Sequence, residues 1–274
     1  MSSDITIVTA FFDIGRGTWP SIVRGHVLPP YQHRTNETYL SYFNLLASID
    51  NPMVIFTELK FIETIKKIRE DHGHADKTKI IAYPDGEVFS AHDKETLLKD
   101  IDKTMNSDSF ISKVNEPWLP EYWNSKYVMI NFMKSDFVVE ALPSVETPLV
   151  AWIDFGYCRT KQSLPISGKW RYDFDPNKIH FFNQYPIVHS RDIRDIVKTG
   201  DVYIQGCHIV GGKEAWKKLK SSIYKNVDIL LKSSYIDDDQ TLLLMSYLDK
   251  EKDFELHQAD PNDWFMIFKR YNRL

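Results

Sequence analysis

One short segment, residues 152–159, combines side chains that could bind a diphosphate. Its acid, Asp154, directly follows a continuously apolar run and so lies at the end of a predicted buried strand. A carboxylate there is costly unless it is paired or metal-bound, and a hard divalent cation that bridges a diphosphate requires such oxygens. Gly156 would let the backbone approach a ligand, and Arg159 could neutralise phosphate charge through two parallel hydrogen bonds. The segment predicts a metal and phosphate site at Asp154; a turn closed by an Asp154–Arg159 pair is the alternative.

A run of three acids, Asp237, Asp238 and Asp239, precedes a predicted helix. Negative charge at a helix N-terminus is favourable, so simple capping is one explanation of the run. The mutual repulsion of the three carboxylates could also raise the pKa of one of them, which would suit a general base toward an acceptor hydroxyl. The sequence leaves both explanations open.

Two other segments could contribute to the same site. The end of the first apolar run, from Thr9 to Asp13, could place backbone groups and a carboxylate against a nucleoside, or form a plain strand and turn. Gly211 and Gly212 open a predicted helix after residues 206–210. That segment lacks the phosphate-loop and dinucleotide glycine patterns, so a tight turn without a ligand explains it equally well.

The remaining candidates are weaker. Asp173 and Asp175 have the spacing of a metal-binding pair, but they lie in a turn-rich stretch and rank second to Asp154. His257 is either a late metal ligand or an ordinary surface histidine. The sequence has no Gly-x-Ser-x-Gly pattern, and Cys158 has no obvious base partner. Nucleophilic acyl chemistry is therefore disfavoured.

These residues need a scaffold whose strand ends meet. Short apolar, β-branched runs predict buried strands at residues 6–12, 53–57, 79–83, 148–154, 179–182 and 201–204, and one more within 253–274. Apolar residues at helical spacing predict helices at 35–46 and 61–68, in pieces within 86–120, at 121–141 and 213–230, and after 237–240. This alternation favours parallel strands with ligands at their carboxyl ends. We expect one α/β domain over residues 1–274, with a mostly parallel central sheet flanked by helices.

Composition narrows the function classes. The chain has 274 residues, 43% of them hydrophobic, and 34 Lys and Arg against 38 Asp and Glu, a net charge of -4. This balance gives no general attraction to phosphate backbones, so we expect no nucleic-acid partner. Two cysteines are too few for a disulfide framework or a four-cysteine zinc site and favour a reducing compartment.

The sequence also suggests a location. No apolar run is long enough to span a bilayer, and the start lacks the basic and small-residue features of a signal peptide. We expect a cytoplasmic protein. The basic residues Lys269, Arg270 and Arg273 give weak support for peripheral contact with the inner face of the membrane. A homodimer is the default expectation for an assembly.

Taken together, these segments resemble the HtrL/YibB family of bacterial proteins, whose members look like glycosyltransferases of the GT-A fold. The resemblance is carried by residues 7–13, 34–39, 51–57, 123–127 with Lys134, 152–156 and 238–240, which span nearly the whole chain. It implies a single GT-A-like domain with a Rossmann-like sheet. Residues 1–150 would form mainly the nucleotide-binding half, and residues 151–274 the half that holds the metal and the acceptor.

The resemblance also implies roles for residues. Asp154 matches the first acid of the GT-A Asp-x-Asp motif, which holds a divalent metal against the donor diphosphate, but Gly156 replaces the second. Mn²⁺ or Mg²⁺ at Asp154 would then need His257, or Asp173 or Asp175, as a further ligand. Asp239 matches the base of inverting relatives, with Asp238 as the second choice. The implied donor-binding residues are Thr9, Ala10, Phe11, Asp13, Arg34, Lys134, Asp154, Gly156, Arg159, Gly211 and Gly212.

The implied activity is transfer of a sugar from a nucleotide-sugar, with a UDP-sugar favoured, to a saccharide hydroxyl. Inversion is favoured, and the acceptor would belong to a bacterial surface polysaccharide such as an O-antigen, a lipopolysaccharide or a capsule, lipid-linked acceptors included. Two alternatives stay open. Because Gly156 replaces an acid, the protein could bind sugar nucleotides or glycans without catalysis; it could also be a nucleotide-sugar hydrolase.

Overall fold

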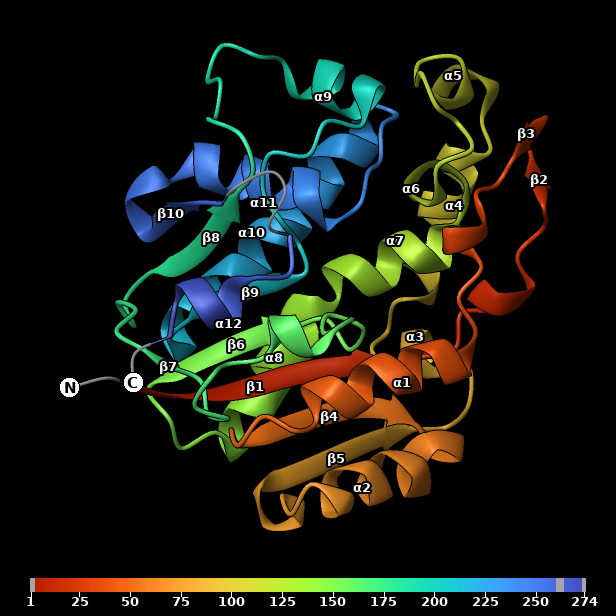
Figure 1. Ribbon diagram of the computed structural model, residues 1–274. Helices are drawn as coiled ribbons and strands as arrows, with labels where there is room; N and C mark the ends of the chain where they lie inside the picture. Colours follow the sequence, from red (N-terminus) through yellow and green to blue (C-terminus); the bar gives the residue numbers. More distant parts are fainter. Residues whose placement is uncertain (1–2, 260–263, 273–274) are drawn as a thin grey trace.

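A large central sheet runs through the molecule, as the computed structural model of the chain shows (Figure 1). The structure describes residues 3–259 and 264–272. The strands follow the order β10-β8-β9-β6-β1-β4-β5, and the short β7 pairs with the start of β1. Their bounds are β1 (Ser3–Phe11), β4 (Met53–Glu58), β5 (Thr78–Tyr83), β6 (Leu149–Ile153), β7 (Arg171–Tyr172), β8 (Ile179–Asn183), β9 (His208–Gly211) and β10 (Phe254–Gln258).

The directions of the strands decide which chain segments meet. Strands β6, β1, β4 and β5 are mutually parallel, and β10 is parallel to β8. Strand β9 lies antiparallel between β6 and β8, with Ile153 opposite His208. The carboxyl ends of β1 and β6 therefore lie beside the amino end of β9. The expected α/β architecture with a mostly parallel central sheet is confirmed.

Helices cover both faces of the sheet. The amino-terminal helices are α1 (Asn36–Leu46), α2 (Ile62–Asp71), α3 (Val88–Ala91), α4 (Glu95–Met105), α5 (Asp108–Ile111), α6 (Pro120–Trp123), α7 (Ser125–Phe132) and α8 (Lys134–Ala141). The others are α9 (Ile193–Thr199), α10 (Lys213–Lys232), α11 (Asp239–Asp249) and α12 (Ile267–Arg270). Strand β2 (Ile22–Val23) pairs with β3 (His26–Val27) in a separate hairpin.

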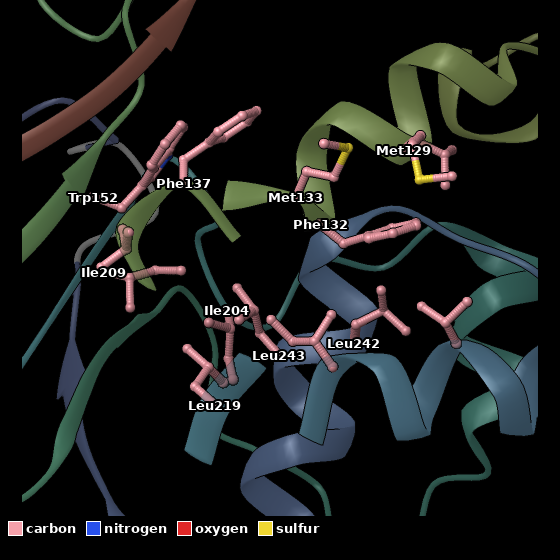
Figure 2. Packing of buried hydrophobic residues seen from close by; sticks show 14 of the residues in the cluster. Met129, Phe132, Met133, Phe137, Trp152, Ile204, Ile209, Leu219, Leu242 and Leu243 are labelled. Atoms are coloured by element: carbon pink, nitrogen blue, oxygen red, sulfur yellow. The ribbon is translucent and has the colours of Figure 1, made fainter. Parts of the chain in front are cut away.

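Two apolar cores result, one on each face of the sheet. Successive side chains of a strand point to opposite faces, and in β1 Val8 belongs to one core whereas Ile7 belongs to the other. The larger core joins the sheet to α7, α8, α10 and α11, and in it the Phe137 ring stacks with Trp152 at 6.2 Å between ring centroids (Figure 2). It holds α8 and α11, which carry candidate site residues, against the end of β6.

Most predicted elements are confirmed, and three differ. Residues 201–204 form no strand beyond a single bridge from Ile204 to Asn183. Within residues 206–212, which were predicted as a turn before a helix, residues 208–211 form the strand β9. Strand β9 has only four residues, too few to be recognised as a strand in the sequence. All four are buried, and they complete the sheet between β6 and β8. The predicted helix 121–141 is divided, because Asn124 caps a new helix by accepting a hydrogen bond from the Tyr127 N–H (2.9 Å). Helix α9 was missed.

The described helices include none with the length and apolar composition needed to cross a membrane. Of the three basic residues expected to contact a membrane surface, Lys269 and Arg270 belong to α12. Arg273 lies outside the described residues.

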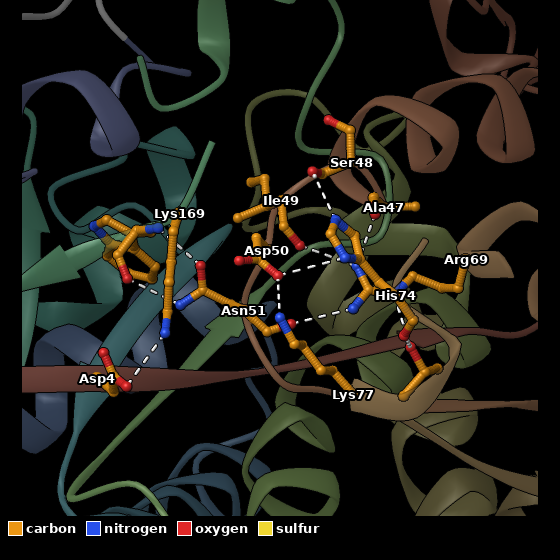
Figure 3. A network of polar contacts seen from close by, with 12 residues as sticks. Asp4, Ala47, Ser48, Ile49, Asp50, Asn51, Arg69, His74, Lys77 and Lys169 are labelled. Atoms are coloured by element: carbon orange, nitrogen blue, oxygen red, sulfur yellow. Dashed lines mark hydrogen bonds and ion pairs between the residues drawn. The ribbon is translucent and has the colours of Figure 1, made fainter. Parts of the chain in front are cut away.

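A fully buried arginine fastens α2 to the chain between α1 and β4 (Figure 3). The Arg69 guanidinium donates hydrogen bonds to the carbonyl oxygens of Ala47 (2.7 Å), Ile49 (3.0 Å) and Asn51 (3.1 Å). The Asn51 side chain in turn donates to the Ile5 carbonyl of β1 (2.8 Å). These contacts satisfy carbonyls that the fold removes from water.

We predict that Arg69→Met lowers the free energy of unfolding by about 3 kcal/mol or more, because each orphaned buried acceptor costs about 1–3 kcal/mol. Urea unfolding followed by circular dichroism measures the change. Lys66→Met, on the exposed side of the same helix, is the control and should change little, because exposed ion pairs such as Lys66–Glu70 contribute little. Equal effects of the two substitutions would contradict this role of Arg69.

Candidate active site

A cavity of about 640 Å³ opens at the edge of the sheet where β1 and β6 end. This is the edge at which parallel α/β sheets bind ligands. Its lining comes from both halves of the chain, and ten predicted site residues belong to it: Ala10, Phe11, Asp13, Arg34, Lys134, Asp154, Gly156, Arg159, Asp238 and Asp239. Thr9 is fully buried within β1 and does not line the cavity.

A buried lysine joins the two principal acids. The Lys134 ammonium lies 2.7 Å from Asp239 Oδ2 and 3.2 Å from Asp154 Oδ1, and it donates a hydrogen bond to the Gly206 carbonyl (3.0 Å). Burial disfavours the charged ammonium, but Asp154 and Asp239 outweigh this effect and raise the pKa of Lys134. The lysine is therefore charged, and it occupies the position between the carboxylates.

Asp154 is held at the end of β6 by its neighbours. The Trp152 indole N–H donates to Asp154 Oδ1 (2.7 Å), and the Asp154 backbone N–H donates to the Cys207 carbonyl (2.9 Å). The side chain is 36% exposed, and it lines the cavity. Its cationic partner is Lys134, so the alternative of a turn closed by Arg159 is wrong.

Asp239 begins α11 and packs directly against Gly206. A Cβ atom at position 206 would lie 2.2 Å from Asp239 Oδ2 and 2.7 Å from its Cγ, so only glycine leaves room for this carboxylate. Burial raises the pKa of Asp239, although Lys134 opposes the shift. A buried carboxylate with a raised pKa is suited to accept a proton.

The other two acids of the run have structural partners. Asp238 is the N-cap of α11 and accepts a hydrogen bond from the Gln240 N–H (3.0 Å). Asp237 accepts from the Thr241 hydroxyl (2.7 Å) and from the Asp238 N–H (2.8 Å). Capping thus explains Asp238. Asp239 differs from the other two acids because it forms an ion pair with Lys134.

Three arginine side chains also line the cavity. Arg159 lies over the Phe265 ring at 4.3 Å, and partial burial together with the neighbouring Arg34 lowers its pKa. Arg16, which the sequence analysis missed, donates to the Gln32 carbonyl (3.0 Å) and the Tyr39 hydroxyl (2.9 Å). Its place just after the first strand, between two glycines, was the available signal.

The guanidinium groups of Arg16, Arg34 and Arg159 lack a carboxylate at ion-pair distance within the described ranges. Arg171, Arg191 and Arg194, in contrast, each have such a partner. Like charges that gather in a cavity without a counter-ion repel each other, and an anionic ligand would relieve that repulsion. This part of the cavity is therefore suited to a phosphate group.

Asp13 lines the cavity but is occupied by its own turn. Its carboxylate accepts hydrogen bonds from the Asn36 amide (2.9 Å) and the Gly15 N–H (2.9 Å) and lies 3.4 Å from the Lys60 ammonium. Burial opposes ionisation, yet these partners lower the pKa of Asp13. The buried Glu58, also missed in the sequence, accepts from the Asp13 N–H (3.0 Å). The plain strand-and-turn alternative accounts for these contacts.

Gly211 and Gly212 are at the opposite edge of the sheet, which corrects their prediction as donor-binding residues. Strand β9 is antiparallel to β6, so its carboxyl end, Gly211, lies opposite Val150 rather than near Asp154. A Cβ atom at Gly212 would lie 2.0 Å from the Pro176 carbonyl oxygen. Both glycines permit close backbone packing, and of residues 206–212 only Gly206 and Cys207 line the cavity.

His257 does not share a site with Asp154, which corrects its prediction as a ligand to the same metal. It lies on β10, stacks on Phe182 with ring centroids 5.0 Å apart, and does not line the cavity. Asp173 and Asp175 are absent from the lining as well, and Asp175 accepts a hydrogen bond from the Asn177 N–H (2.9 Å).

The residues around Asp154 consequently do not fit a divalent cation. Gly156 supplies no oxygen side chain and packs against Tyr39, whose ring atoms would lie 3.1–3.2 Å from an added Cβ. The Lys134 ammonium already lies between the carboxylates of Asp154 and Asp239. A second cation there would be repelled by the first, and the sites that Mg²⁺ prefers offer several oxygens in octahedral geometry.

A known protein family matches nearly the whole chain. The family model described as "bacterial protein of unknown function (HtrL_YibB)" matches residues 3–272. The chain belongs to the HtrL/YibB family. It is 32% identical to Protein HtrL of Escherichia coli (strain K12) over 276 residues, which cover 98% of this chain and 93% of that protein. The resemblance seen in the sequence is confirmed.

Solved structures show more distant likenesses. The PaToxG glycosyltransferase matches with a TM-score of 0.40 and 10% identity, over 91% of this chain and 71% of that one. The 4-diphosphocytidyl-2C-methyl-D-erythritol synthase of Anaerococcus prevotii matches with a TM-score of 0.41 and 12% identity, over 96% of this chain and 89% of that one. The inositol-1-phosphate CTP transferase of T. maritima matches with a TM-score of 0.42 and 12% identity, over 93% of this chain and 85% of that one.

The acids beside the cavity predict an unusual dependence of stability on pH. Burial raises the pKa of Asp237 to about 8, and Glu121, which lines the cavity, adds to the shift. A carboxyl that binds its proton more tightly in the folded chain stabilises the fold at low pH. This contribution disappears as the pH rises through the folded-state pKa, because the charged form is then buried.

We therefore predict that Asp237→Asn becomes more stable relative to the unmodified protein as the pH rises from 6 to 9, by roughly 1–3 kcal/mol over this range. Urea unfolding at each pH measures the difference. Glu63→Gln, a change at an exposed position of α2, is the control and should show no such trend. A constant difference between Asp237→Asn and the unmodified protein would show that Asp237 does not titrate there.

Proposed function

We propose that the cavity is the active site of a glycosyltransferase that uses a nucleotide-sugar and inverts the anomeric centre. The observation that carries the proposal is the combination, in one cavity, of the Asp154–Lys134–Asp239 triad with guanidinium groups that have no carboxylate at ion-pair distance among residues 3–259 and 264–272. A nucleoside diphosphate sugar is an anion joined to a polar, uncharged ring. The cavity offers cations to the first part and hydrogen-bonding carboxylates to the second.

The arginines would bind the diphosphate. Arg34 lies close enough to Arg159 to lower the pKa of Arg159, and Arg16 lines the same cavity. Guanidinium groups match phosphate oxygens in bidentate geometry. Fixed cations at this position would also stabilise the negative charge that grows on the diphosphate as it leaves, which is the electrostatic contribution that accelerates such reactions most.

Asp239 would be the general base. A bond forms between the acceptor oxygen and the anomeric carbon, while the bond from that carbon to the diphosphate oxygen breaks. The hydroxyl proton passes to Asp239, and the nucleoside diphosphate leaves with the bonding electron pair. Lys134 holds the Asp239 carboxylate, and Gly206 leaves the space that this carboxylate occupies.

Lys134 would take the place of a divalent metal. In this proposal its ammonium supplies the positive charge beside Asp154, so donor binding requires no Mn²⁺ or Mg²⁺. The GT-A resemblance implies a metal cofactor at Asp154, and in this proposal the Lys134 ammonium takes its place. The acceptor that the family resemblance favours is a saccharide of a bacterial surface polysaccharide, and a UDP-sugar is the favoured donor.

Donor recognition is tested by binding. A panel of UDP-, GDP-, CMP- and dTDP-sugars is titrated calorimetrically into the protein in the presence of chelator. One nucleotide class should bind, and Arg34→Gln and Arg159→Gln should each weaken it by about 10- to 100-fold, since a hydrogen bond to a charged group contributes about 1.5–3 kcal/mol. Arg194→Gln is the control, because Arg194 pairs with Asp192 outside the cavity. Equal affinities in the unmodified protein and all three variants would show that neither Arg34 nor Arg159 binds the donor.

Catalysis is tested with the donor that binds. Asp239→Asn should lower the transfer rate by about 10²- to 10⁴-fold, the usual contribution of a general base, while donor affinity is kept. The unfolding curve of the variant shows that the fold persists. Binding without any transfer by the unmodified protein would favour the non-catalytic alternative that Gly156 suggests. Equal release of free sugar with and without acceptor would indicate a hydrolase.

A further inference from the structure

A second group of metal-ligating side chains lies on the edge of the sheet formed by β8 and β10. Glu255 and His257 are alternate residues of β10, so they share one face of this edge strand. The parallel register places His180 of β8 opposite Glu255. None of the three residues lines the active-site cavity.

Their ligand atoms are within reach of a single ion. His180 Nδ1 lies 2.9 Å from His257 Nε2. The Glu255 carboxylate oxygens lie 3.8 Å from His180 Nδ1 and 3.9 Å from His257 Nε2. One atom from each residue can be chosen so that all three lie within 4.8 Å of one another. Tetrahedral zinc, with bonds to nitrogen of about 2.0–2.1 Å, holds its ligand atoms roughly 3.3 Å apart, so small side-chain shifts would complete the geometry.

The orientation of His180 is already that of a metal ligand. Its Nε2 lies 2.9 Å from the Asp175 carbonyl oxygen, which can only accept, so Nε2 carries the proton and donates. The lone pair of the neutral imidazole is then on Nδ1, the atom that faces His257. Metal-bound histidines commonly donate their second N–H to a backbone carbonyl in this way.

The surroundings fix the imidazoles and leave one side open. Phe174 packs against both rings, with centroids 4.8 Å from His180 and 5.6 Å from His257. His180 is 1% exposed, whereas the Glu255 side chain is 44% exposed and gives an ion access from solvent. Without an ion, His257 Nε2–H donates to His180 Nδ1. A metal bound at His257 Nε2 would shift the proton of this neutral ring to its Nδ1.

We propose that His180, Glu255 and His257 bind one zinc ion, with the fourth position open to water. Two imidazoles and a carboxylate suit Zn²⁺, whereas Mg²⁺ and Ca²⁺ prefer oxygen ligands only. Because β10 is the edge strand and pairs only with β8 in the described sheet, the ion would cross-link the two strands. The site is separate from Asp154 and independent of the proposed transferase activity.

Equilibrium dialysis of the chelator-treated full chain against Zn²⁺ alone tests the proposal. We expect one zinc ion per chain, a visible absorption band of tetrahedral Co²⁺ when cobalt replaces zinc, and a higher unfolding temperature with Zn²⁺. His257→Gln and Glu255→Gln should each weaken zinc binding at least about tenfold, in line with the loss of a ligand or its close partner. Glu255→Gln changes a partly exposed side chain, so it provides the test if the His257→Gln variant fails to fold.

Two control variants separate this site from others. His189→Gln changes an exposed histidine that pairs with Glu251, and Asp154→Asn changes the active-site acid. Both should bind one zinc ion with unchanged affinity. The proposal is overturned if the unmodified protein binds no zinc at micromolar concentrations, or if His257→Gln and Glu255→Gln bind it as the unmodified protein does.

Discussion

The buried ammonium of Lys134 is the contact on which the candidate site depends. It joins the start of α8 to the end of β6 through Asp154, to α11 through Asp239, and to the segment before β9 through the Gly206 carbonyl. Removing one partner of a buried ion pair leaves a charge without compensation and typically costs several kcal/mol. The four elements are therefore fixed relative to one another by charge as well as by apolar packing, and the adjacent features serve this arrangement: Gly206 leaves room for Asp239, and the Trp152 indole orients Asp154.

Basic and acidic groups meet at the cavity. Arg16, Arg34 and Arg159 line it without a carboxylate at ion-pair distance among the described residues, and Glu121 lines it as well. Burial and the neighbouring Glu116 raise the pKa of Glu121, and burial and Glu121 raise the pKa of Asp237, which precedes the lining residue Asp238. Burial of like charges is tolerated where a ligand later compensates them, and perturbed acids of this kind concentrate at functional sites. An anionic donor at the arginines and a neutral saccharide near the acids would satisfy both parts, which is the reason for assigning them to one reaction.

Local pattern in the sequence predicted the scaffold well. Apolar runs located β1, β4, β5, β6 and β8, and their alternation with helices predicted the mostly parallel sheet. Asp154 could be predicted as a site residue because an acid after a buried strand is costly and lies at the ligand-binding edge. The capping explanation for the acidic run was also available, and it holds for Asp238.

The remaining features depend on contacts between distant residues. Nothing local indicates that Lys134 meets Asp239, 105 residues away in the sequence. Gly211 and Gly212 were placed at the wrong edge because the direction of β9 depends on its pairing with β6 and β8. His257 was assigned to Asp154 for a similar reason: its neighbour is His180, which only the register of β8 with β10 reveals.

If Lys134, rather than a divalent cation, provides the positive charge beside Asp154, donor binding needs no added metal. Calorimetric titration of the protein with its nucleotide-sugar donor, once with EDTA and once with Mn²⁺, measures this directly. We expect the same dissociation constant in both titrations. Binding that requires Mn²⁺ and disappears with EDTA would contradict it, because the metal would then have to displace the Lys134 ammonium from between Asp154 and Asp239.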